Sequence, residues 1–104
     1  MAGMGKFLKQ AQKMQTDMAR IQEEIKNTTL EATSGGGVVK VIMRGDKKID
    51  SIEIDSSFFE DPDPEMLQDL IVAAVNQACD EVDEYSQEKL GKITQGMQIP
   101  GLSL

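Results

Sequence analysis

The chain has 104 residues, and its 18 acidic against 11 basic side chains give a formal charge of −7. It contains no His and a single Cys, so it lacks the side chain that most often shuttles protons near neutral pH and cannot form an internal disulfide or an ordinary zinc site. These absences disfavour most hydrolytic, redox and zinc-dependent mechanisms. We therefore expect a protein that is not an enzyme and uses no cofactor, metal or small-molecule substrate.

Size and hydropathy place further limits on the chain. A length of 104 residues predicts one domain, 1–104. No run approaches the roughly 18 apolar residues of a membrane span, and the start, MAGMGKFLKQ, turns polar too early for a signal peptide. We expect a cytoplasmic protein without membrane contact. Its four Phe and Tyr residues give little bulk for a core, which favours a dimer that shares one.

Residues 1–27 form the first predicted element, an amphipathic helix. Its apolar side chains recur at alternating spacings of three and four residues, the a/d pattern of a coiled-coil seam: Met4, Phe7, Ala11, Met14, Met18, Ile21 and Ile25. A helix lying across a globular core normally presents a wider apolar face. The narrow seam predicts that this helix packs against another helix.

Residues 28–55 are predicted to form three strands. The Thr-rich segment 28–34 is followed by three glycines that break the chain, and in the next segment, 38–44, Val39, Val41 and Met43 share one face. A tight turn over residues 44–47 leads to a third strand, 49–55, with Ile52 and Ile54 on one side. The short connections predict an antiparallel meander.

Residues 64–90 form the last predicted element, a long helix. Asp63 is expected to cap it, because a carboxylate accepts from the free N–H groups of a first turn, and Pro64 suits that turn because it has no N–H to lose. Lys89, Gly91 and Lys92 are expected at its C-terminal end, before a flexible tail, 91–104. Apolar residues at helical spacing predict a face in the core or a dimer interface: Leu67, Leu70, Ile71, Ala74, Val75 and Ala78. The run from 70 to 75 is apolar throughout, which predicts burial on most sides.

The element order predicts an α+β fold: a helix, a three-stranded antiparallel meander and a long helix. After Ala78 the second helix continues as DEVDEYSQEK, and this acidic half is expected to project into water. Two helices with narrow seams at the ends of a small sheet predict arms that extend from a compact base.

Positive charge is concentrated in the first helix. Residues 1–22 carry four basic side chains and one acidic side chain, a local charge of +3 that leaves −10 for the remainder. With Met4 at heptad position a, the basic residues lie at c or f, away from the seam: Lys6, Lys9, Lys13 and Arg20. Such a stripe fits a phosphate backbone, which is bound through charge without base reading. The alternative is an ordinary solvated helix face, which the overall acidity favours.

Three other sequence features, a glycine run, an acidic cluster and a cysteine, do not indicate a ligand-binding or catalytic site. The glycines at 35–37 precede a strand and are not followed by Lys-Ser/Thr, so they do not form a phosphate-binding loop. The acidic cluster at 60–65 lacks the spacing of an EF-hand, and the start of the helix accounts for it. Cys79 is flanked by Asp80 and lacks a basic neighbour, so we expect a packing residue rather than a nucleophile.

The chain resembles the YbaB/EbfC family of bacterial nucleoid-associated proteins over nearly its whole length. The resemblance is carried by the first helix, KFLKQAQKMQTDMARIQEEI, and by LEATSGGGVVKV, DPEMLQDLIVAAVNQA and QGMQIPGL. It implies a homodimer in the cytoplasm and nucleoid, in which the strands and inner helical parts build a shared core and protruding helices grip double-stranded DNA. The implied role is architectural or regulatory, with low sequence specificity.

The choice of DNA-contacting residues rests on the charge pattern, because the family offers no contact motif that transfers residue by residue. The predicted contacts are Lys6, Lys9, Lys13 and Arg20, with Lys89 and Lys92 contributing from the second helix. The acidic stretch at 80–88 is not expected to contact the duplex unless its carboxylates face away from it. The main alternative is an acidic holdase-like chaperone or protein-interaction module, since prefoldin subunits also place seam-bearing helices on either side of a β hairpin.

Overall fold

The computed structural model describes the backbone of residues 2–96 and the side chains of residues 4–93. Two helices, α1 (Ala2–Asn27) and α2 (Pro64–Gly96), flank three strands, β1 (Thr29–Ser34), β2 (Val39–Arg44) and β3 (Ile49–Ile54). The strands form one antiparallel sheet in the order β1-β2-β3. This confirms the predicted α+β fold. Short 3₁₀ turns, η1 (Gly35–Gly37) and η2 (Ser56–Glu60), connect β1 to β2 and β3 to α2.

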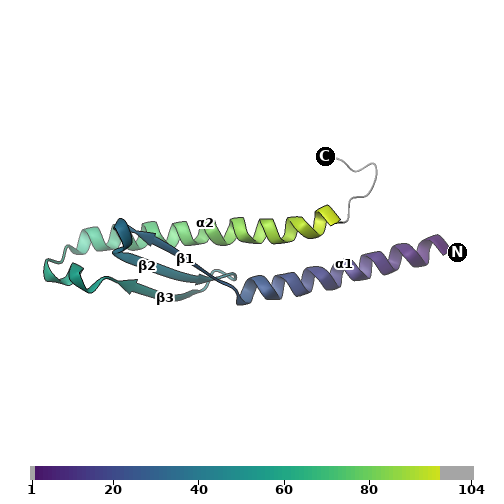
Figure 1. The fold of residues 1–104 in the computed structure, drawn as a ribbon, viewed down its shortest axis with the longest axis horizontal. Helices are drawn as coiled ribbons and strands as arrows, with labels where there is room; N and C mark the ends of the chain where they lie inside the picture. The colour runs from purple at the N-terminus through teal and green to yellow at the C-terminus, as the bar shows by residue number, and fades with distance from the viewer. Residues whose placement is uncertain (1, 97–104) are drawn as a thin grey trace.

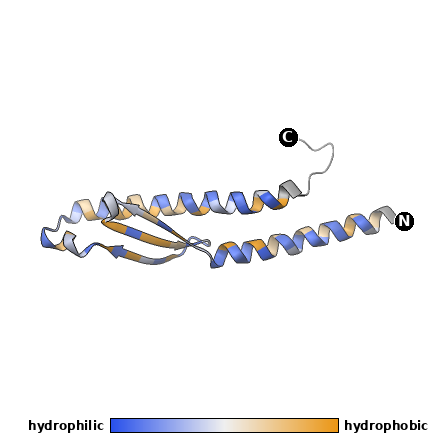
Figure 2. Ribbon diagram, viewed as in Figure 1, coloured by the Kyte–Doolittle hydropathy of each residue, from blue (hydrophilic) through white to orange (hydrophobic). Residues whose placement is uncertain are grey.

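The molecule is elongated and has two parts. The body consists of the sheet and the first half of α2, and the arm consists of α1 and the second half of α2 (Figure 1). The principal extents of the molecule are 74 × 26 × 15 Å. The first half of α2 lies on the sheet, and its second half runs antiparallel to α1 beyond the end of the sheet (Figure 1). Apolar residues gather in the strands and in the first half of α2, whereas the arm is more hydrophilic (Figure 2).

The core lies between α2 and the sheet. Val39, Val41 and Met43 alternate along β2 and are at most 1% exposed, which confirms their predicted shared face. From α2, Ala74 and Ala78 are fully buried, and their small side chains let the helix backbone approach the strands. The other predicted core residues of α2 are partly buried and pack against this cluster: Leu67, Leu70, Ile71 and Val75.

The two ends of α2 differ in how well the sequence predicted them. At the N-terminal end, the Asp63 carboxylate accepts from the backbone N–H of Met66 at 3.2 Å, which confirms the predicted cap. At the other end the helix continues to Gly96, so the predicted end near residue 90 was wrong. Gly91 is inside the helix, where it costs only about 1 kcal/mol relative to Ala, and the half-buried Ile93 extends the apolar spacing. The predicted flexible tail lies outside the described residues from 97 onward.

The seam of α1 meets α2 along only part of its length. Ile25 is buried, and Met14 and Ile21 are half-buried. Towards the N-terminus, Met4 and Phe7 are each 66% exposed. The predicted helix partner is therefore α2 of the same chain for the inner part of the seam, and the outer end of α1 projects beyond it (Figure 1).

The turn between β2 and β3 joins the sheet to α1. The backbone N–H of Lys47 donates to the Arg44 carbonyl at 2.8 Å, which confirms the predicted tight turn. The backbone N–H of Gly45 donates to the Thr28 carbonyl at 2.9 Å. A Cβ atom at Gly45 would lie 1.7 Å from the Ile25 carbonyl oxygen. Only a residue without a side chain allows this close approach.

Candidate nucleic-acid interface

Three lysines at the outer end of α1 form a cationic face. Lys6, Lys9 and Lys13 are exposed, and none has an ion-pair partner in the described part of the chain. At 100° per residue they lie within about 60° of one another around the helix axis. Residues 2–16 contain no acidic side chain. Three of the predicted contact residues therefore present unopposed positive charge in one direction; we call them the lysine face.

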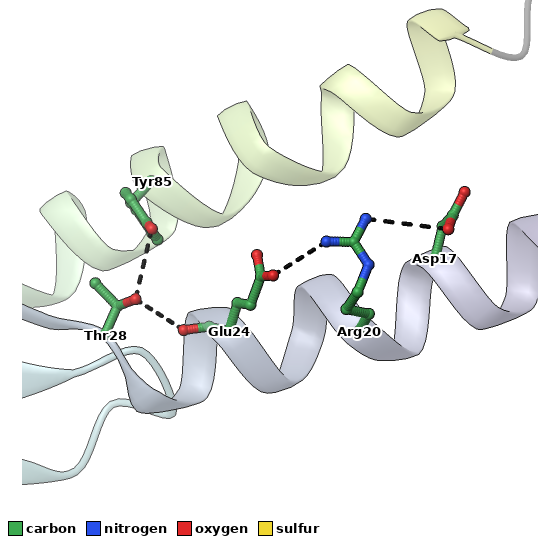
Figure 3. Close-up of polar contacts among 5 residues, drawn as sticks. All are labelled: Asp17, Arg20, Glu24, Thr28 and Tyr85. Carbon is green, nitrogen blue, oxygen red and sulfur yellow. Dashed lines mark hydrogen bonds and ion pairs between the residues drawn. The ribbon is translucent and has the colours of Figure 1, made fainter.

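Arg20, the fourth predicted contact on α1, is held by carboxylates of its own helix. Its Nη1 lies 3.0 Å from Glu24 Oε1, and its Nη2 lies 4.0 Å from Asp17 Oδ1 (Figure 3). The three charges sit at i−3 and i+4 spacing, where side chains on a helix meet. A phosphate would have to compete with both carboxylates for this guanidinium. Arg20 and the lysine face therefore lie on the same helix, but the charge of Arg20 is offset by Asp17 and Glu24, whereas that of the lysine face is not.

The two predicted cations of α2 lie in different surroundings. The Lys89 ammonium lies 5.5 Å from the centroid of the Tyr85 ring, within the range of a cation–π contact. Lys92 is exposed. The Tyr85 hydroxyl lies 3.5 Å from Oγ1 of Thr28 and links α2 to the end of α1 (Figure 3). Sequence reasoning missed this link, because the two residues are 57 positions apart.

A shallow hollow opens between the two helices, with a volume of about 620 Å³. It is lined by Arg20, Glu23, Glu24, Asn27, Thr28 and Tyr85. Two carboxylates against one guanidinium give it a net negative charge. A polyanion is therefore repelled from this hollow, and the lysine face further out on α1 is the favourable surface.

The acidic half of α2 is partly neutralised by the β2–β3 turn. The Lys47 ammonium lies 2.7 Å from Asp83 Oδ1. The hydrogen bond to Asp83 and the charge of its carboxylate raise the pKa of Lys47. This lysine is thus engaged with α2, and the pair ties the turn to the helix. Four further carboxylates remain on this stretch: Asp80, Glu81, Glu84 and Glu88.

An apolar surface is left uncovered on the body. Ile49 and Ile52 of β3 share a face with the core residues of β2 through the pairs Met43–Ile49 and Val41–Ile52, yet they are 46% and 40% exposed. The reason is that α2 packs on β1 and β2 and leaves β3 open. Val72 of α2 is 58% exposed, so the predicted burial of residues 70–75 on most sides was wrong. We call Ile49 and Ile52 the uncovered face.

Residues 1–97 match the YbaB/EbfC DNA-binding family. The chain belongs to this family. It is 48% identical over 99 residues to a nucleoid-associated protein of Pelotomaculum thermopropionicum, with 95% of this chain and 94% of that protein covered. These matches confirm the resemblance to YbaB/EbfC proteins predicted from the sequence.

The fold also occurs in a solved structure. A crystal structure of an uncharacterized protein from Helicobacter pylori superposes with a TM-score of 0.60 at 28% identity, over 75% of this chain and 90% of that chain. Among residues 2–96, neither helix has the combination of length and apolarity that crossing a bilayer requires.

Proposed function

We propose that this YbaB/EbfC protein is a nucleoid-associated protein of the cytoplasm that binds double-stranded DNA as a homodimer with low sequence specificity. The observation that carries the proposal is the lysine face: three exposed ammonium groups on a helix segment without carboxylates. Membership of a DNA-binding family and the name of the Pelotomaculum relative support it. Its role is architectural or regulatory rather than catalytic.

The arrangement of the arm suits contact with a phosphate backbone. The outer end of α1 extends beyond the end of α2 (Figure 1), so its lysines lie away from the acidic stretch of the second helix. Ammonium groups bind phosphates as point charges and do not distinguish base pairs. Low sequence specificity follows from this chemistry.

The test is a fluorescence-anisotropy titration of a short duplex at several salt concentrations. Two copies of the lysine face supply roughly three to six phosphate contacts, so the logarithm of the affinity should fall with the logarithm of salt with a slope of about −3 to −5. A second duplex of unrelated sequence should bind with similar affinity. A slope near zero, or no binding at low salt, would contradict the proposal.

The uncovered face supports the homodimer. Its two isoleucine side chains pair with buried residues of β2 and continue the apolar surface of the core onto the edge strand β3. A chain of this size buries only about two thirds of its extended surface when it folds. A second copy that packs its own uncovered face here would enlarge both cores, and it would present the lysine face twice.

The substitution Ile52→Asp tests the dimer. A charge placed in an apolar interface without a partner is costly, so we expect the dimer to dissociate at least about ten times more readily, since 1.4 kcal/mol corresponds to a factor of ten. The matched control is Ser51→Asp, which adds the same charge to the opposite face of β3, where Ser51 pairs with Ile42. Light scattering after size exclusion gives the mass of each variant, and circular dichroism checks its fold. If Ile52→Asp and the parent have the same dimeric mass across a dilution series, the interface lies elsewhere.

A further inference from the structure

The apolar seam of α1 continues past the part that packs on α2. Met4 and Phe7 are each 66% exposed, Ala11 is exposed and Met14 is half-buried. These four residues occupy successive a and d positions, and we call them the outer seam. The outer end of α1 extends beyond the end of α2 (Figure 1). The pattern that joins two helices further in is therefore also present where α1 has no helix of its own chain beside it.

We propose that the outer seam pairs in antiparallel orientation with the outer seam of a second copy, and that this contact joins two DNA-bound dimers. The inference rests on the proposed function, which supplies the dimer and the DNA. Two joined dimers hold two duplexes, or two stretches of one duplex, next to each other. The protein would then bridge DNA as well as bind it.

The charge pattern of α1 suits a second copy of the same helix. Positions e and g flank the seam of a helix pair, and the charges there set which partner fits. At the outer end these positions carry Leu8, Gln10 and Gln15, which are uncharged. A like copy is therefore not repelled along the seam, and a partner with charged flanks finds no opposite charge to pair with. Leu8 is 58% exposed and adds apolar area to the contact.

The lysine face points away from this contact. At 100° per residue, its centre lies about 150° around the helix from the centre of the outer seam. In a pair of helices the two lysine faces therefore lie on opposite outer sides. With helix diameters of about 10–12 Å they are roughly 20 Å apart, more than twice the Debye length of about 8 Å at physiological ionic strength. Their mutual repulsion is screened, and each face stays free to hold a duplex.

The sizes of the seam residues favour the antiparallel orientation. In an antiparallel pair, an a residue faces a d residue of the other helix. Phe7 then lies against Ala11 of the second copy, and Met4 lies against Met14. A large side chain opposite a small one fills the space between helices well. In a parallel pair like residues face each other, so two alanines meet in one layer and leave a gap.

Antiparallel pairing also determines which copies can meet. The body lies at the inner end of α1 (Figure 1), so two helices paired at their outer ends carry their bodies at opposite ends of the pair. Their uncovered faces cannot touch in that arrangement, and the two copies must come from different dimers. The overlap from Met4 to Met14 is only about 15 Å long, which suits a weak contact. It becomes effective where DNA holds many dimers close together.

The first measurement is the capture of a fluorescent duplex by the full-length protein bound to an immobilised duplex. The variant Met4→Gln with Phe7→Gln removes apolar groups from the outer seam and keeps the net charge and a good helix former at each position. We expect capture to fall at least about tenfold, which corresponds to 1.4 kcal/mol. The matched control is Gly5→Ala with Gln12→Ala, which changes two exposed positions outside the seam. It should capture as much duplex as the parent.

Disulfide cross-linking tests the pairing without DNA. In a Cys79→Ala background, a Met4→Cys protein and a Met14→Cys protein are mixed at high concentration and mildly oxidised. We expect disulfide-linked pairs that contain one chain of each kind. Either protein alone should form few such pairs, because antiparallel pairing holds like positions about 15 Å apart, further than a disulfide can reach.

Two outcomes would overturn the proposal. One is equal capture of the second duplex by the seam variant and the control. The other is cross-linking of the Met4→Cys protein alone to the same extent as in the mixture, because the helices would then not pair in antiparallel orientation. Binding of a single duplex, measured by anisotropy on the same samples, tests the proposed function separately. It should be the same in the parent, the seam variant and the control, since all three keep the lysine face.

Discussion

Replacing Gly45 by alanine is expected to destabilise the protein by about 3 kcal/mol, near the upper end of the range for overpacking. The added Cβ would lie 1.7 Å from the Ile25 carbonyl oxygen and 2.4 Å from its carbonyl carbon. These are backbone atoms, and the same carbonyl accepts from the Thr28 N–H at 3.1 Å. Relief of the clash therefore requires the last turn of α1 to move away from the β2–β3 turn.

That movement removes two further interactions. The hydrogen bond from the Gly45 N–H to the Thr28 carbonyl would break, and Ile25, now 6% exposed, would lose its contacts. Urea denaturation followed by circular dichroism measures the free energy of unfolding. The control is Gly91→Ala, where nothing lies within 4 Å of the added Cβ and the change should stabilise α2 by about 0.5–1 kcal/mol. If Gly45→Ala unfolds within about 0.5 kcal/mol of the parent, the range of an ordinary surface substitution, the contact is not as close as described.

The second large effect is expected from neutralising the lysine face. The triple substitution Lys6→Gln, Lys9→Gln and Lys13→Gln removes six positive charges from the proposed homodimer. Each lost phosphate contact lowers the salt slope by about 0.9, so the slope should approach zero, and the affinity at low salt should fall by roughly 100-fold or more. The fold should be unaffected, because the three side chains are exposed and have no ion pair among the described residues.

A matched triple variant separates local contact from net charge. Lys26→Gln, Lys40→Gln and Lys48→Gln change the net charge equally but lie outside the outer end of α1. Lys40 forms two exposed ion pairs, with Glu31 and Glu53, whose loss matters little for stability. This variant should keep most of the affinity. An equal loss of duplex affinity in both triple variants would show that only the net charge of the protein matters. The lysine face would then not be the DNA-binding site.

Much of the fold could be predicted because its signals are local. The alternation of Val39, Val41 and Met43 predicted the buried face of β2. Asp63 followed directly by Pro64 predicted the start of α2. The end of α2 was mispredicted because a glycine was taken as a stop signal, although a glycine within a helix is tolerated when residues beyond it still pack. The open side of β3 could not be predicted, because it depends on where α2 crosses the sheet.

The candidate site was predictable in position but not in detail. Periodicity placed Lys6, Lys9 and Lys13 on one side of α1. The ion pairs of Arg20 could have been predicted, because Asp17 and Glu24 lie three residues before and four residues after it. The heptad pattern gives only the position of Arg20 relative to the apolar seam and so did not reveal them. The pair of Lys47 with Asp83 joins residues 36 positions apart, and no local pattern points to it.

The way α1 joins the body has a mechanical consequence. The helix is held along its inner part, where Ile25 is buried and Ile21 and Met14 are half-buried, and Lys6 lies about 12 Å beyond Met14 along the helix axis. The outer end therefore acts as a short lever, and a bend of about 5° near Met14 moves Lys6 by about 1 Å. Small bends at this point would let the outer end follow a double helix whose groove width varies along its length.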